Sequence, residues 1–126
     1  MIVDTSAIVA IARDEPDAET LVDILAHSVG TRISAGTVLE SSLVLSGSRS
    51  ALLDEFLSTH DIEIVPFDAE QLRVAREAHD RYGRGSGSPA RLNFGDCFAY
   101  ALAKTTREPL LFKGDDFTRT DVTSAR

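Results

Sequence analysis

The chain begins with the stretch Met1-Ile2-Val3-Asp4-Thr5-Ser6-Ala7-Ile8-Val9-Ala10, in which a short apolar run ends on an aspartate. A run of this kind predicts a buried central strand over residues 1–4. Asp4 then lies at the carboxyl end of that strand, which is where open α/β sheets build their functional sites. Because a buried carboxylate without a partner is energetically costly, we expect Asp4 to meet other functional groups there.

Beyond this stretch, predicted helices alternate with predicted strands. We expect helices over residues 5–13 (with Thr5 or Ser6 as the cap), 17–28, 36–46, 50–59, from a cap at Asp68 to about Tyr82, and 94–105. We expect strands over residues 31–34, 62–67 and 110–112, and a short edge strand over 118–122. This order predicts an α/β fold, in which a mainly parallel sheet of about five strands is flanked by helices on both faces.

The length and composition are typical of one globular domain, which we place over residues 1–126. No apolar run approaches the roughly 18 residues of a membrane helix, and the apolar start lacks the basic leader of a signal peptide. Cys97 is the only cysteine, so nothing points to an oxidising compartment. We therefore expect a cytoplasmic protein without a membrane segment.

The formal net charge of −7 argues against a general nucleic-acid binder, because phosphate binding usually needs a basic surface. Three possibilities remain open: metal binding through carboxylates, a basic protein partner, or a local basic patch within an acidic whole. No convincing arrangement of serine or cysteine with histidine is present, and His27, His60 and His79 are expected on the surface. The first possibility directs attention to the acids.

Acidic residues stand at further places that this architecture brings toward one edge of the sheet. Glu40 lies in a helix of small and apolar residues, Asp96 opens the last predicted helix, and Asp115 and Asp116 follow a buried strand. Converging carboxylates raise one another's pKa, and a hard divalent cation such as Mg²⁺ relieves that repulsion. Each acid also has a structural interpretation, as a helix cap for Asp4 or as a solvated, helix-dipole or turn residue for the others.

Taken together, these segments resemble the PIN domain family, and within it the VapC-type ribonuclease toxins of toxin–antitoxin pairs. The resemblance runs nearly from end to end. It is carried by Ile2-Val3-Asp4-Thr5-Ser6-Ala7, by Glu40, by Leu92-Asn93-Phe94-Gly95-Asp96-Cys97, and by Leu111-Phe112-Lys113-Gly114-Asp115-Asp116-Phe117 with Thr120-Asp121. It implies a sheet with parallel strands, an acidic site for Mg²⁺ or Mn²⁺, and endonuclease cleavage of RNA.

The resemblance also implies roles for individual acids. Asp4, Glu40 and Asp96 match the first three family acids, and Asp116 matches the fourth, with the adjacent Asp115 as an alternative. We expect Asp4, Asp96 and Asp116 to hold the ion. Glu40 is expected either to ligate it or to position and deprotonate the water that attacks the phosphodiester.

Supporting residues and partners follow from the same resemblance. Ser6 matches a small hydroxyl residue near the metal, and Asn93 matches a polar residue near Asp96. The family implies an RNA substrate, a VapB-type antitoxin whose basic segment can plug the acidic pocket, and a homodimer.

One segment stands out as a candidate RNA contact. Residues 83–91 are rich in glycine and are expected to form an irregular, flexible loop, with Arg81, Arg84 and Arg91 in it or beside it. Such a loop can follow a phosphate backbone, contact a partner chain, or simply be solvated.

Two rival functions remain open from the sequence alone. A Mg²⁺-dependent phospho-receiver or phosphatase-like α/β protein would be phosphorylated on Asp4. Against this, Ser6 stands where a haloacid-dehalogenase-type site needs a second aspartate, and Lys113 is a poor receiver lysine. The second rival is a non-catalytic PIN-like binding module, against which the retained acids argue.

Overall fold

The computed structural model describes residues 1–126, apart from the side chain of Ser48. The strands are β1 (Ile2–Val3), β2 (Arg32–Ser34), β3 (Glu63–Val65) and β4 (Leu110–Leu111). The helices are α1 (Thr5–Ala12), α2 (Ala18–Ala26), α3 (Ala35–Val44), the 3₁₀ helix η1 (Gly47–Arg49), α4 (Ser50–Thr59), α5 (Ala69–Tyr82) and α6 (Phe94–Thr106). Among the described helices, none combines the length and the apolar character that a membrane crossing requires.

The strands form one parallel sheet in the order β3-β2-β1-β4. Ile2 pairs with Arg32 of β2 on one side and with Leu110 of β4 on the other, so β1 lies inside the sheet. This confirms the predicted α/β fold with a parallel sheet and a central first strand. The sheet has four strands, slightly fewer than expected.

The edge strand predicted over residues 118–122 is wrong. This segment forms turns, in which the backbone N–H and the hydroxyl of Thr120 both donate to the carbonyl of Phe117, at 3.1 and 2.7 Å. Local side-chain bonding of this kind competes with strand pairing. The chain does reach the sheet edge two residues later, because Ser124 forms a parallel bridge with Leu110 of β4.

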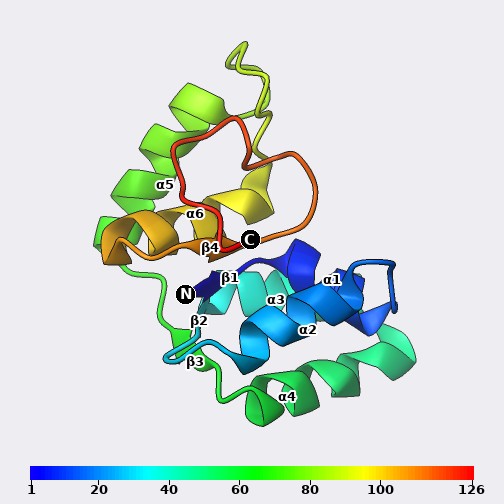
Figure 1. Cartoon of the computed structure of the whole chain (residues 1–126). Coiled ribbons are helices and arrows are strands. Elements are labelled where there is room, and N and C mark those ends of the chain that lie inside the picture. Colours follow the sequence, from blue (N-terminus) through cyan, green and yellow to red (C-terminus); the bar gives the residue numbers. More distant parts are fainter.

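Successive residues of each strand face opposite sides of the sheet. Ile2 and Leu110 pack with residues of α5 and α6 in one apolar core, whereas Val3 and Leu111 pack with residues of α1, α2 and α4 in another. Figure 1 shows these two groups of helices on either side of the short strands. The prediction of helices on both faces is confirmed, and burial on both faces explains the apolar sequences of β1 and β4.

Several helix ends differ from the prediction by one or two residues, and α3, for instance, ends at Val44 and not at residue 46. Two of these differences concern α1 and α2. The cap of α1 is Asp4 and not Thr5 or Ser6, since the Asp4 carboxylate accepts the backbone N–H of Ser6. Helix α2 ends at Ala26, before the predicted residue 28. The difference at α1 matters, because Asp4 both follows strand β1 and caps helix α1, so one of its carboxylate oxygens is already bonded within the fold.

The segment 83–91 is irregular, as predicted. Its two ends are joined by backbone hydrogen bonds from Arg84 N–H to the Leu92 carbonyl and from Leu92 N–H to the Tyr82 carbonyl, at 3.0 and 2.9 Å. The Ser86 hydroxyl also donates to the Gly83 carbonyl at 2.6 Å. The two ends of the segment therefore lie side by side, at the end of α5 and directly before α6.

Helices α3 and α6 approach closely at Gly36. A Cβ atom at this position would overlap the ring of Phe98, so the contact requires glycine. Phe98 in turn packs edge-on against Phe67 and Phe94, with ring centroids 4.8 and 5.0 Å apart. This close approach brings the middle of α3, which carries Glu40, against the first turn of α6.

We expect Gly36→Ala to lower the free energy of unfolding, although alanine in a helix is ordinarily worth about 1 kcal/mol more than glycine. The added methyl group must displace the Phe98 ring, and overpacking of this kind typically costs about 1–3 kcal/mol. Urea unfolding followed by circular dichroism measures the change. In a Phe98→Ala background the same substitution should be neutral or stabilising, and an equal loss in both backgrounds would contradict the contact.

Candidate active site

The sheet topology brings acids from four parts of the chain to one edge. Asp4 follows β1, Asp116 follows β4, and Glu40 lies in α3 directly after β2. Because β1 lies between β2 and β4, both neighbouring strands deliver an acid beside Asp4. Asp96 joins them from the first turn of α6.

Asp4 is buried, with 2% of its surface exposed. Its Oδ2 accepts the backbone N–H of Ser6 at 2.9 Å and the Ser6 hydroxyl at 2.6 Å, whereas its Oδ1 is buried without a hydrogen-bond partner. Burial raises the pKa of Asp4 to about 6 against the effect of the Ser6 hydrogen bonds, and the charge of Glu40 adds to the rise. Asp4 thus caps a helix with one oxygen and keeps the other available.

Asp96 is held by a reciprocal capping box at the start of α6. Its carboxylate accepts the Asn93 backbone N–H at 2.8 Å, and its own N–H donates to the Asn93 side chain at 2.9 Å. Burial raises the pKa of Asp96 to about 7 against the effect of the Asn93 hydrogen bond. The negative charges of Asp4, Asp116 and Glu40 raise it further, so all four acids are electrostatically coupled.

Glu40 reaches this group by lying over Gly95. A Cβ atom on Gly95 would overlap the Glu40 carboxylate where it now lies, so glycine lets the carboxylate take this place over α6. The sequence motif contains Gly95, but our reading of the sequence gave it no role. A glycine in the first turn of a helix, directly before an acid, is the signal that could have identified it, because glycine is unfavourable there without a packing reason.

Ser6 connects two strand ends. While its hydroxyl donates to Asp4, the same oxygen accepts the backbone N–H of Lys113 at 3.0 Å. The Lys113 ammonium pairs in turn with Glu15 and with Asp17 in the connection between α1 and α2. The end of β4, from which the fourth acid follows, is therefore connected to Asp4 through the Ser6 hydroxyl.

The arrangement suits a hard divalent cation. The candidate donors are carboxylate oxygens, one of them buried without a partner, and their mutual repulsion is the kind that a cation relieves. In the part of the chain that the structure describes, no three acidic, histidine or cysteine side chains stand close enough to hold an ion as they lie. The acids are thus gathered by the fold without forming a closed ligand set.

The two candidates for the fourth acid both lie in the exposed turn after β4. The charge of Asp116 contributes to the pKa shift of Asp96, which places Asp116 within electrostatic reach of the other acids. This favours Asp116 over Asp115, in agreement with the order of preference drawn from the sequence.

The remaining candidates lie elsewhere. Arg84 and Arg91 are exposed, whereas the guanidinium of Arg81 lies 4.7 Å from the centroid of the Tyr82 ring and 3.8 Å from the Asp121 carboxylate. Burial raises the pKa of Cys97 to about 11, which makes this thiol unsuited to nucleophilic attack.

The histidines lie outside the site, as expected. His27 and His79 are exposed, and His60 is half-buried at the end of α4. The chemistry of the site is accordingly that of its carboxylates.

We expect the free energy of unfolding to fall as the pH rises from about 5 to about 8 in buffer without divalent cations. The pKa values of Asp4 and Asp96 rise from 3.8 to about 6 and about 7 on folding, so the folded chain binds more protons in this range. Each group then removes up to about 1.4 kcal/mol of stability per pH unit between its unfolded and its folded pKa, and the loss levels off above the folded pKa. Urea unfolding at several pH values measures the slope.

The control for this prediction is Asp96→Asn, which keeps the size of the side chain and removes one titrating group. Its stability should depend less steeply on pH than that of the wild type. An identical slope in both proteins would contradict the assignment of the effect to Asp96.

Comparison with known proteins identifies the family of this chain. The PIN domain family matches residues 1–122. Ribonuclease VapC28 of Mycobacterium tuberculosis is 50% identical over 129 aligned residues, which cover 99% of this chain and 97% of the relative.

Solved structures share the fold at low sequence identity. VapC20 of Mycobacterium tuberculosis, described as a sarcin–ricin loop cleaving toxin, aligns with a TM-score of 0.80 at 15% identity, over 99% of this chain and 98% of that one. A toxin–antitoxin complex from Klebsiella pneumoniae aligns with a TM-score of 0.74 at 15% identity, over 99% and 97%. From the family match and the half-identical relative, it follows that the chain belongs to the PIN domain family and, within it, to the VapC ribonucleases.

Proposed function

We propose that this chain is an endoribonuclease toxin that cleaves RNA phosphodiester bonds with the help of Mg²⁺ or Mn²⁺. The observation that carries the proposal is the buried, half-partnered carboxylate of Asp4, at a sheet edge where three further acids converge. Membership in the VapC ribonucleases supports the reaction class and argues against the phospho-receiver and phosphatase-like alternative. Residues 1–126 act as one PIN domain in this proposal.

The four acids have different roles in the proposed hydrolysis. Asp4, Asp96 and Asp116 would hold the cation, and Glu40 either adds a ligand or accepts the proton of the attacking water. When bound, the cation neutralises charge that develops on the phosphodiester and makes water a better nucleophile. The water oxygen bonds to phosphorus in line as the bond to the 3′-oxygen breaks, and no protein nucleophile takes part.

RNA must be held by a local group of positively charged side chains, because the chain as a whole is acidic. We assign this role to Arg84 and Arg91, which are exposed on the irregular segment before α6. A glycine-rich loop with arginines can follow a phosphate backbone. Arg81 is the weaker candidate, because its guanidinium faces Asp121 at 3.8 Å.

The proposal includes two protein partners. One is a VapB-type antitoxin, suggested by the structural likeness to a solved toxin–antitoxin complex, and the net charge of −7 suits a basic antitoxin segment. The other is a second copy of this chain, because exposed apolar side chains such as Leu39, Leu43 and Phe94 offer a surface that a homodimer would bury. Such a toxin acts on cellular RNA, so we place it in the cytoplasm.

Asp116→Asn is expected to reduce cation-dependent RNA cleavage about a hundredfold or more, because it removes charge from the site where the transition state needs the cation. Purified protein is incubated with bacterial RNA and Mn²⁺ or Mg²⁺, and the new RNA ends are sequenced. Asp4→Asn should give a loss of similar size, and a chelator should abolish cleavage by the wild type.

Asp115→Asn is the matched control, since it makes the same chemical change one residue away. It should keep most of the activity if Asp116 is the fourth acid. Equal cleavage by the wild type and by the Asp4→Asn and Asp116→Asn variants would overturn the assigned site. A wild type that binds RNA without cleaving it would favour a non-catalytic binding module.

The double variant Arg84→Ala/Arg91→Ala is expected to raise KM for RNA with little change in kcat, because backbone contacts hold substrate and transition state alike. The salt dependence of RNA binding should become shallower by about one unit per lost phosphate contact. Arg73→Ala is the control, since Arg73 is also exposed but pairs with Glu77 on α5. A double variant with the KM and salt dependence of this control would contradict the assignment.

A further inference from the structure

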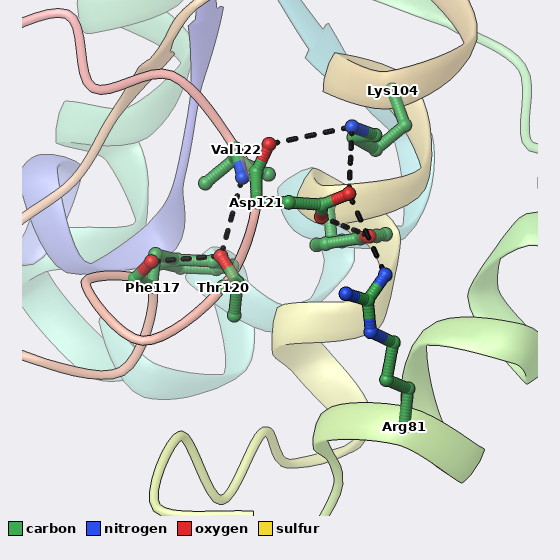
Figure 2. Close-up of polar contacts among 7 residues, drawn as sticks. Arg81, Lys104, Phe117, Thr120, Asp121 and Val122 are labelled. Carbon is green, nitrogen blue, oxygen red and sulfur yellow. Dashed lines mark hydrogen bonds and ion pairs between the residues drawn. The ribbon is translucent and has the colours of Figure 1, made fainter.

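Asp121 lies outside the group of four acids and is tied to the two helices that cover one face of the sheet. Its carboxylate accepts the Tyr100 hydroxyl at 2.6 Å and the Lys104 ammonium at 3.1 Å, both from α6. The Lys104 ammonium also donates to the Asp121 backbone carbonyl at 3.3 Å, and Arg81 of α5 faces the carboxylate at 3.8 Å. Figure 2 shows Arg81 of α5 and Lys104 of α6 pointing toward Asp121.

The segment that carries Asp121 also carries Asp116. After Asp116 the chain buries Phe117 against Phe112, with ring centroids 5.1 Å apart. It then turns back through Thr120, whose hydroxyl accepts the Val122 N–H at 3.4 Å, as Figure 2 shows. This turn presents Asp121 to α6.

The same helix holds both the tether and a site acid. Tyr100 follows Asp96 by one turn of α6, so the hydrogen bond to Asp121 fastens the Asp116 segment one turn away from Asp96. At its other end the segment is fastened by the bond from Lys113 N–H to Ser6. Asp116 thus lies between two attachment points. Before it, the Lys113 N–H is bonded to Ser6, which is bonded to Asp4, and after it, Asp121 is bonded to the helix that carries Asp96.

We propose that Asp121 is a positioning residue, which clamps the Asp116 segment onto α6 and so sets where Asp116 stands relative to Asp96. The inference rests on the proposed metal-dependent function and deepens it. Asp121 does not touch the cation or the substrate. It acts through Asp116 alone.

The clamp is polar and partly exposed, so the fold does not depend on it. The Asp121 side chain is 40% exposed, and the segment keeps its buried Phe117 and its backbone bonds from Leu110 to Thr123 and from Ala125 to Leu110 without it. Burial opposes ionisation of Asp121, but the Tyr100 hydrogen bond and the Lys104 ammonium prevail and lower its pKa. The carboxylate therefore stays charged at neutral pH and continues to accept the hydrogen bonds of Tyr100 and Lys104.

The test measures Mn²⁺ affinity by calorimetry, with the full chain and without RNA. Asp121→Ala should weaken Mn²⁺ binding about tenfold, the usual size for loss of a group that orients a metal ligand. Tyr100→Phe, which removes one hydroxyl and keeps the ring, should weaken it less. Asp121→Asn retains an acceptor for Tyr100 and should restore part of the affinity.

Two further measurements separate positioning from general damage. In an Asp116→Asn background, Asp121→Ala should cause no additional loss of Mn²⁺ affinity, whereas independent damage would add. Saturating Mn²⁺ should return RNA cleavage by Asp121→Ala toward the wild-type rate. Glu77→Ala is the matched control, because it also removes one acidic side chain but lies on α5 in an exposed pair with Arg73.

The outcomes distinguish this inference from the function on which it rests. A wild type that neither binds Mn²⁺ or Mg²⁺ nor cleaves RNA would overturn the proposed function and the inference with it. A wild type that does both, together with unchanged Mn²⁺ affinity in Asp121→Ala, would overturn the inference alone. Additive losses in the Asp116→Asn background would also overturn it.

Discussion

The Ser6 hydroxyl donates to the Asp4 carboxylate at 2.6 Å and accepts the backbone N–H of Lys113 at 3.0 Å. It thereby joins the carboxyl ends of the neighbouring strands β1 and β4. The bond to Asp4 fixes one oxygen of a buried carboxylate and leaves the other without a partner. The charges of Glu40 and Asp96 act on this carboxylate or are acted on by it. The parallel order of β2, β1 and β4 brings acids to its two sides, and α6 brings a further acid over it.

The folded chain carries this concentration of charge because local bonds offset part of its cost. Asp4 caps α1 and Asp96 completes a capping box on α6, so each acid stabilises the helix that follows it. The cost of burial and of charge repulsion that these bonds do not offset raises the pKa values of both residues. Perturbed pKa values of this kind commonly mark functional sites, and the apolar cores on the two faces of the sheet supply the stability that offsets their cost.

The sequence predicts most of the fold because its signals are local and periodic. The apolar run before Asp4, the apolar strand before Asp115 and the helical spacing between them depend on neighbours in the chain. The segment 118–122 differs from the predicted strand because local bonds from Thr120 to Phe117 favour turns over a strand. The role of Gly95 depends on its contact with the distant Glu40, and the glycine before Asp96 is only an indirect local sign of it. The choice between Asp115 and Asp116 is of the same kind, since adjacent residues in a turn differ only in direction.

The close approach of Glu40 to Gly95 has a consequence for how such sequences vary. The two positions lie 55 residues apart, yet the volume available at one is determined by the length of the side chain at the other. A homologue with alanine in place of Gly95 would have to turn the Glu40 carboxylate away from its present place over α6, or carry a shorter acid at that position. Substitutions at these two positions should therefore be correlated during evolution, and the pair would appear in an alignment as one coevolving unit.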